Sequence, residues 1–166
     1  MSTTTLLSVE EYLRTSYPDG DREYIDGRIV ERNMGTFRHA DWQTSMVIYL
    51  AIHYPAIWRV VECRVQVKAT RFRVPDITCG AGLKPQVEII TDPPFLVIEV
   101  LSPDDRTADT QEKIDDYLSF GVPYVWVVNP LTRRGYVYTS DGMHEAKDGV
   151  LRTSDPEIAL PLYEID

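Results

Sequence analysis

The sequence predicts an α/β fold in which helices flank a mixed β-sheet. The expected elements follow the order helix, three strands, helix, strand, which is typical of a sheet covered by helices. The strand expected at residues 124–128 is almost wholly apolar, as strands are when both of their faces are covered. A chain of 166 residues suits one domain and would bury roughly 70% of the surface that its unfolded form exposes. We therefore expect a single domain over residues 1–166.

The first elements are a short helix and a hairpin. Ser8 and Glu11 have the spacing of a capping box, which predicts a helix beginning after Ser8. Asp26 and Gly27 lie between two runs of alternating polarity within residues 23–32, the strongest short-range signal for a β-hairpin.

A long helix is predicted from Thr36 to about His53, with Pro55 closing it. Its apolar stripe recurs at helical spacing and consists of Trp42, Met46, Tyr49 and Leu50. Three strands should follow, at about residues 59–67, 72–78 and 95–101.

A second helix is predicted over about residues 108–120, because Gly121 provides a C-terminal stop and Pro123 lies just beyond it. The apolar strand at residues 124–128 comes next. Residues 134–139 and the region around Val150 predict further, more peripheral strands.

The composition restricts the classes of partner. Twenty-six acidic and 17 basic residues give a net charge of −9, which opposes tight, sequence-independent binding to DNA. Part of the positive charge is clustered and forms either a local basic face or an ordinary solvated strand face: Arg59, Arg64, Lys68, Arg71 and Arg73.

Cysteine use and hydrophobicity indicate a compartment. The two cysteines, Cys63 and Cys79, suggest neither a disulfide framework nor a zinc cluster. The N-terminus lacks the basic and apolar regions of a secretion signal, and no run of about 18 apolar residues occurs. We therefore expect a cytoplasmic protein without membrane partners.

The most informative feature is Glu99, the one carboxylate at the centre of the apolar run 95–102. A buried, ionised carboxylate costs several kcal/mol unless a cation or strong donors meet it. Asp76, after Pro75, is similarly the only acid in its strand-like run. Two such carboxylates with a backbone carbonyl and waters can hold Mg²⁺. The alternative is that Asp76 ends a strand in a turn and Glu99 pairs with an arginine, and for Asp76 alone this alternative is favoured.

Lys113 is a candidate cation for this site. On a helical wheel it falls at the edge of the apolar stripe, which consists of Ile114, Tyr117, Leu118 and Phe120, so it should point toward the sheet. The alternative is a lysine that merely extends along the apolar stripe toward solvent.

Residues 97–130, together with Pro75, Asp76 and the hairpin that begins at Glu23, resemble the Uma-two family of putative restriction endonucleases, a branch of the PD-(D/E)XK nuclease superfamily. The resemblance covers about residues 8–140. Its most specific part is the Glu-Val-Leu-Ser-Pro run at 99–103, followed by Asp109, Lys113, Tyr117, Gly121 and a Tyr-x-Trp-x-Val strand. It implies a restriction-endonuclease-like sheet with an αβββαβ core, preceded by an N-terminal helix and hairpin.

The resemblance also implies roles for individual residues. Asp76 and Glu99 would be the metal-binding acids, with the carbonyl of Val100 as a further ligand. Leu101 stands where the superfamily usually has its lysine, and Lys113 would enter the same pocket as a migrated lysine.

Two other residues match the family. His39 corresponds to a histidine at the start of the long helix, and Glu23 to an acid in the hairpin. From its helical position alone, beside Trp42 and Met46, His39 is interpreted as a core histidine with satisfied hydrogen bonds.

The resulting hypothesis is a metal-dependent endonuclease that hydrolyses DNA phosphodiester bonds with Mg²⁺ or Mn²⁺. DNA binding should be weak and salt-sensitive, with Arg71 and Arg73 as the candidate contacts, and by analogy the protein should be a homodimer. The alternative is a catalytically inactive, nuclease-fold interaction domain that binds a protein or nucleic-acid partner. Leu101 and the net charge favour this alternative, whereas the presence of Asp76, Glu99 and Lys113 together favours the enzyme.

Overall fold

A six-stranded mixed sheet forms the centre of the molecule. The computed structural model describes residues 6–17, 22–33 and 35–165. Residues 1–5, which belong to the N-terminal segment assessed above for a secretion signal, lie outside the described residues. The strands of the sheet lie in the order β10-β9-β8-β7-β6-β3. Their bounds are β3 Trp58–Val61, β6 Ile77–Gly80, β7 Leu96–Val100, β8 Tyr124–Asn129, β9 Arg134–Thr139 and β10 Gly142–Glu145.

The predicted αβββαβ core is confirmed. Helix α2 (Phe37–His53) precedes β3, β6 and β7, which pair antiparallel in sequence order. Helix α3 (Thr107–Phe120) then connects β7 to β8, and these two strands are parallel. A parallel pair needs such a crossover connection, because a tight turn cannot join two strands that run in the same direction.

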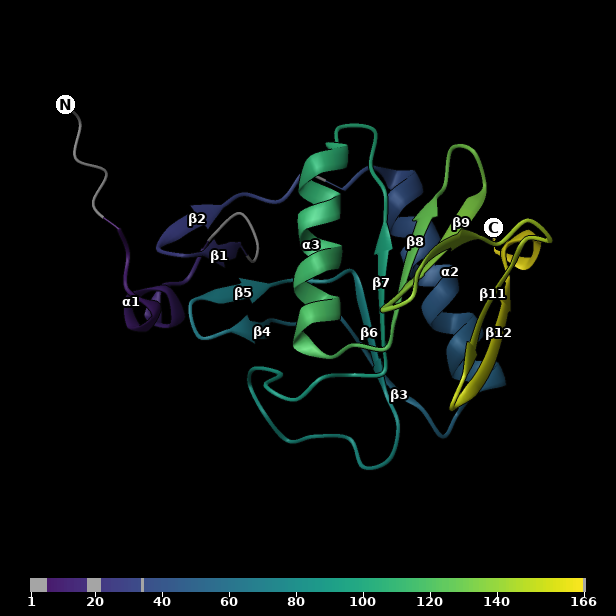
Figure 1. Ribbon diagram of the computed structural model, residues 1–166, viewed down its shortest axis with the longest axis horizontal. Helices are drawn as coiled ribbons and strands as arrows, with labels where there is room; N and C mark the ends of the chain where they lie inside the picture. The colour runs from purple at the N-terminus through teal and green to yellow at the C-terminus, as the bar shows by residue number, and fades with distance from the viewer. Residues whose placement is uncertain (1–5, 18–21, 34, 166) are drawn as a thin grey trace.

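The two helices cover opposite faces of this sheet (Figure 1). Successive side chains of a strand alternate between its faces. Leu96, Ile98 and Val100 accordingly pack in the cluster that contains α2 residues, and Val97 packs in the cluster that contains α3 residues. Glu99 therefore shares its face with Val97, on the side covered by α3.

A second sheet, in the order β2-β1-β5-β4, corrects two of the predicted strands. Its members are β1 Glu23–Ile25, β2 Arg28–Val30, β4 Val65–Lys68 and β5 Arg71–Arg73. The strand expected at 59–67 is divided at Glu62, which has a φ of 50°. The strand expected at 72–78 is divided around Pro75, which has no N–H for a ladder hydrogen bond. At both breaks the chain passes from one sheet to the other.

The predicted N-terminal elements are present. Helix α1 (Val9–Arg14) begins with the reciprocal capping box of Ser8 and Glu11. The hairpin turn uses Asp26 and Gly27, with φ values of 48° and 90°, as a tight hairpin turn requires. Tyr12 of α1 packs on Tyr24 and Phe72, with ring centroids 5.0 and 5.3 Å away, and these contacts attach the helix to the second sheet.

The C-terminal part of the chain adds strands that the sequence analysis did not predict, namely β10 and β12. Strands β11 (Val150–Ser154) and β12 (Glu157–Pro161) form a two-stranded sheet, followed by a 3₁₀ turn at Leu162–Glu164. Their apolar side chains pack in the cluster that contains the α2 stripe. Within the described residues, no helix is long and apolar enough to span a membrane.

Candidate active site

Asp76 lies where the chain passes from the second sheet to the central one. Its backbone carbonyl accepts hydrogen bonds from the side chain of Gln43 at 2.9 Å and from the N–H of Glu62 at 3.3 Å. The two breaks in the predicted strands, at Glu62 and just before Asp76, therefore lie next to each other.

The Asp76 carboxylate is buried and has three partners. Oδ2 accepts a hydrogen bond from the N–H of Val100 at 2.7 Å and lies 3.2 Å from Nε2 of His39. Oδ1 accepts a hydrogen bond from Nη2 of Arg32 at 3.1 Å. The hydrogen bond to Asp76 raises the pKa of His39. His39 is thus buried beside a carboxylate that is a candidate metal ligand, at the wall of a cavity and not within the apolar core.

Glu99 points from the middle of β7 into the layer beneath α3 and is only 6% exposed. The hydroxyl of Tyr117 donates a hydrogen bond to its Oε1 at 2.6 Å, and Nζ of Lys113 lies 3.9 Å from its Oε2. Burial raises the pKa of Glu99 to about 7, the charge of Lys113 opposes this rise, and the charge of Asp76 adds to it. The two acids are therefore close enough to repel each other.

Lys113 points toward the sheet, as the helical pattern predicted. Its Nζ lies 3.5 Å from Oε1 of Glu23 and 3.9 Å from Oε2 of Glu99. The negative charge of Glu99 is the main cause that raises the pKa of Lys113, with Glu23 adding to it, and the side chain stays an ammonium ion. Glu23 is itself held by Nη1 of Arg73 at 3.0 Å and by the N–H of Val74 at 3.1 Å.

The expectation that Arg73 forms part of a basic face for DNA is wrong, and Arg71, whose side chain is 20% exposed, is already paired with acids. Arg73 is 3% exposed, and its guanidinium bridges Glu23 and Asp116, with 2.6 Å between its Nη2 and the carboxylate of Asp116. Arg71 contacts Asp26, Glu112 and Asp116. Both arginines are committed to acids of the protein, since a buried charge without a partner is costly.

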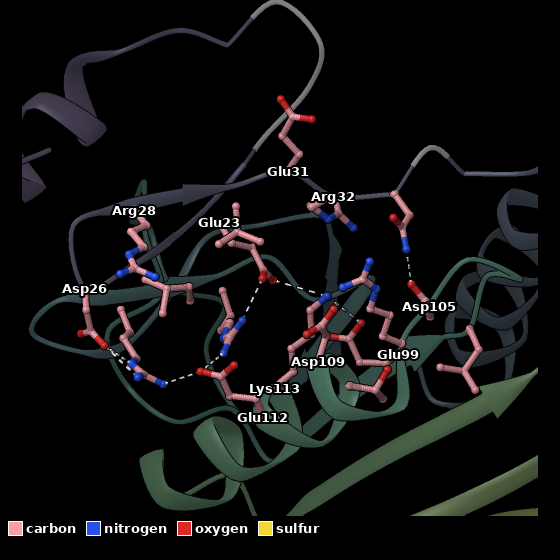
Figure 2. Close-up of a pocket in the computed structure, with 18 of the residues that line it drawn as sticks. Glu23, Asp26, Arg28, Glu31, Arg32, Glu99, Asp105, Asp109, Glu112 and Lys113 are labelled. Carbon is pink, nitrogen blue, oxygen red and sulfur yellow. Dashed lines mark hydrogen bonds and ion pairs between the residues drawn. The ribbon is translucent and has the colours of Figure 1, made fainter. Parts of the chain in front are cut away.

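These side chains line two adjoining cavities that share lining residues. A cavity of about 620 Å³ lies between the β1–β2 hairpin and α3, and a second of about 140 Å³ contains Asp76, His39 and Val100. Glu99, Lys113 and Arg32 line both. Figure 2 shows the hairpin residues along one side of the larger cavity and the α3 residues along the other.

The donor set fits a hard divalent cation. Asp76, Glu99 and Val100 line the same cavity, and the mutual repulsion of the two carboxylates would be relieved by a shared cation. Among the described residues, no group of three or more His, Cys, Asp or Glu side chains could hold a metal. The protein would thus supply two carboxylates and a backbone carbonyl, and water the remaining ligands, as Mg²⁺ sites commonly do.

One contact in the site was absent from the sequence analysis. Arg32 follows the hairpin in a segment without regular structure, and its partner Asp76 is 44 residues away in the chain. No periodicity or motif relates the two positions. The residues that the sequence analysis did predict for the site all line one or both of the two cavities: Glu23, His39, Asp76, Glu99, Val100 and Lys113.

Comparisons with known proteins agree on the fold. The family model Uma2, described as a putative restriction endonuclease, matches residues 9–164. The structure is similar to the crystal structure of a putative nuclease from Anabaena variabilis, with a TM-score of 0.80 and 20% sequence identity over 96% of this chain and 97% of that chain. None of the curated proteins matches the chain.

We predict that the stability of the metal-free protein falls as the pH rises from about 4.5 through about 7. The folded protein holds the Glu99 proton more tightly than the unfolded chain does, because burial raises the pKa of Glu99 from 4.5 to about 7. Glu99→Gln removes this ionisation, so it should raise the free energy of unfolding at pH 8 by roughly 1 to 3 kcal/mol and change it little at pH 5.

Urea unfolding in the presence of a chelator measures this difference. Glu157→Gln, at an exposed position on β12, is the matched control and should behave as the parent at both pH values. Equal effects of Glu99→Gln at pH 5 and pH 8 would show that Glu99 is not the group responsible.

Proposed function

The chain belongs to the Uma2 family of putative restriction endonucleases, and from this premise we propose that it is a metal-dependent endonuclease that hydrolyses DNA phosphodiester bonds. One observation carries the proposal. Asp76 directly precedes β6, Glu99 lies on β7 and Lys113 lies on α3. Their side chains nevertheless line one cavity. Two acids and a lysine around an open cavity are suited to activating water beside a phosphate.

Asp76, Glu99 and the carbonyl of Val100 would hold Mg²⁺ or Mn²⁺. When bound, such an ion polarises a phosphoryl oxygen and lowers the pKa of a coordinated water. Lys113 would direct its ammonium hydrogens at the attacking water or at a phosphate oxygen, since Glu99 and Glu23 fix its position.

The remaining charged residues would position these groups. Glu23 holds Lys113 from the hairpin side, and Arg73 holds Glu23. His39 holds Asp76 from the helix side. We propose that His39 and Glu23 act in this way at the wall of the site, as the resemblance implies.

The larger cavity would receive the DNA strand. Arg28 on β2 and Arg106 at the start of α3 line its two opposite walls. Both are exposed, and within the described parts of the chain neither forms an ion pair. These two arginines are therefore better candidates for phosphate contacts than Arg71 and Arg73.

We also propose that the whole chain is one nuclease domain and that it acts as a homodimer. Cleavage of both strands of a duplex requires two sites, and a two-fold dimer presents two sites in matching orientation. Analytical ultracentrifugation with and without duplex DNA tests the dimer.

Leu101 supports a second candidate, an inactive nuclease-fold domain that binds a partner. Its side chain lines the larger cavity, where the superfamily's usual lysine would stand. A titration with Mn²⁺ separates the candidates, because the enzyme requires a metal at Asp76 and Glu99 and an interaction domain does not.

We predict that Asp76→Asn and Glu99→Gln each abolish metal-dependent cleavage of a plasmid while the protein stays folded. Both changes keep the side-chain shape and remove a charge that the metal requires. Glu157→Gln, at an exposed position on β12 outside both cavities, is the control and should cleave at a rate near that of the parent. Parental cleavage by either site variant would remove that residue from the metal site.

Lys113→Ala should lower the cleavage rate on the order of a hundredfold or more, since it removes a group that acts on the attacking water. Metal binding should persist. Adding Leu101→Lys to this variant should restore part of the activity, because the new ammonium would enter the same cavity. Full activity in Lys113→Ala would mean that Lys113 has no part in the reaction.

DNA binding should depend on Arg28 and Arg106. The double variant Arg28→Glu, Arg106→Glu should bind duplex DNA at least about tenfold more weakly in low salt, with a smaller dependence on salt, because two phosphate contacts are lost. Fluorescence anisotropy in Ca²⁺ or without metal gives the affinity. Lys84→Glu, an exposed cation outside both cavities, is the control. Unchanged affinity in the double variant would place the DNA path elsewhere.

A further inference from the structure

Arg32 contacts the carboxylate that is proposed to bind the metal. Its Nη2 donates to Oδ1 of Asp76 at 3.1 Å, and its Nη1 lies 3.8 Å from Oε1 of Glu62. The side chain is 19% exposed. Arg32 belongs to the segment between the hairpin and α2, whereas Lys113, the cation beside Glu99, belongs to α3.

The segment that carries Arg32 is fixed on its other side as well. Nδ2 of Asn33 donates to Oδ1 of Asp105 at 2.7 Å, and Oδ2 of Asp105 accepts the N–H of Ser102 at 2.6 Å. Ser102 lies just beyond the end of β7, which carries Glu99. Asn33, the neighbour of Arg32 in the chain, is thus tied to the segment that follows β7.

Both carboxylate oxygens of Asp76 have partners in this arrangement. Oδ2 has the N–H of Val100 and Nε2 of His39, and Oδ1 has Arg32. A divalent cation at Oδ1 would meet the positively charged guanidinium on the same oxygen. Because two cations a few ångströms apart in a partly buried site repel each other strongly, the guanidinium and the ion are alternative occupants of Oδ1.

The second place for the guanidinium is the larger cavity. Arg32 lines both cavities, so rotation about its side-chain bonds is enough to carry the charge from one to the other. Figure 2 shows Arg32 on the hairpin side, above Glu99 and Lys113. A guanidinium matches a phosphate with two parallel hydrogen bonds, which an ammonium cannot form.

We propose that Arg32 and the divalent ion exchange at Oδ1 of Asp76. In the metal-free protein Arg32 neutralises Asp76, and with the ion bound Arg32 binds the phosphate of the nucleic acid in the adjoining cavity. This proposal rests on the proposed function, and it makes Arg32 a residue that contacts substrate. The anionic phosphate would also offset the positive charge that the ion adds beside Arg32 and Lys113.

The test compares Arg32→Gln with the parent in three measurements. Calorimetric titration with Mn²⁺ in the absence of DNA should show affinity raised on the order of tenfold, because a charged competitor for Asp76 is gone. Thermal unfolding in a chelator should occur at a lower temperature, since Asp76 loses a partner. Plasmid cleavage at saturating Mn²⁺ should fall at least about tenfold, because a charge-assisted phosphate contact is lost.

Two further variants make the test specific. Arg28→Gln lines the same cavity without contacting Asp76, so its affinity for Mn²⁺ should equal that of the parent. Arg32→Lys keeps the charge but not the paired donors. It should keep the thermal stability and metal affinity of the parent while losing cleavage, and it serves the test even if Arg32→Gln does not fold.

The outcomes separate this proposal from the proposed function. A parent that binds Mn²⁺ and cleaves, with Arg32→Gln unchanged or weaker in metal affinity, would overturn the exchange and leave the nuclease intact. A parent that binds Mn²⁺ at Asp76 without cleaving DNA would overturn the nuclease, while raised affinity in Arg32→Gln would still support the exchange at Oδ1. A parent that binds no Mn²⁺ would overturn both.

Discussion

The buried carboxylate of Glu99 is the constraint on which the rest of the site depends. Its strand pairs in parallel with β8 and is covered by α3, so the charge depends mainly on partners within the protein. Both of its side-chain partners come from one helix. Lys113 and Tyr117 are four residues apart on α3 and therefore lie on the same face, one turn apart. The burial of Glu99 thus fixes the rotation of α3 over the sheet, and this rotation brings Asp109 and Glu112 to the cavity as well.

The second sheet is held against α3 by charges as well as by apolar contacts. Arg73 reaches from β5 to Asp116 of α3 and to Glu23 of β1, and all three side chains are buried. A buried ion network of this kind contributes little net stability, because desolvation offsets most of the attraction between its charges. Its consequence here is positional. It sets Glu23 within 3.5 Å of Lys113, so the hairpin completes a site whose other parts belong to the central sheet.

The sequence predicted the parts of the structure that local patterns encode. Capping residues, turn residues and helical spacing located α1, the hairpin, α2 and α3. The breaks at Glu62 and Pro75 were missed, because the apolar pattern continues across each point where the chain changes sheet. Arg73 was misplaced for a related reason. Arginine is seldom buried, and its burial here depends on acids 43 and 50 residues away. Arg32 was missed because its contact with Asp76 also exists only in the folded chain.

In the proposed nuclease, Lys113 takes the place of a lysine at position 101, where this chain has leucine. Position 101 lies just beyond the end of β7, between the larger cavity and the apolar layer that contains Val97 and residues of α3. Leu101 packs at the edge of that layer. A lysine on the covering helix reaches Glu99 from the opposite side, where the hairpin supplies Glu23 as a second acid. The ammonium is then held by two carboxylates and 23% exposed toward the cavity, a position from which it can meet a substrate without leaving Glu99. With its ammonium on α3, Lys113 depends on Glu23 of the hairpin as its second carboxylate partner, and Glu23 is in turn held by Arg73. These three residues therefore form one interdependent set.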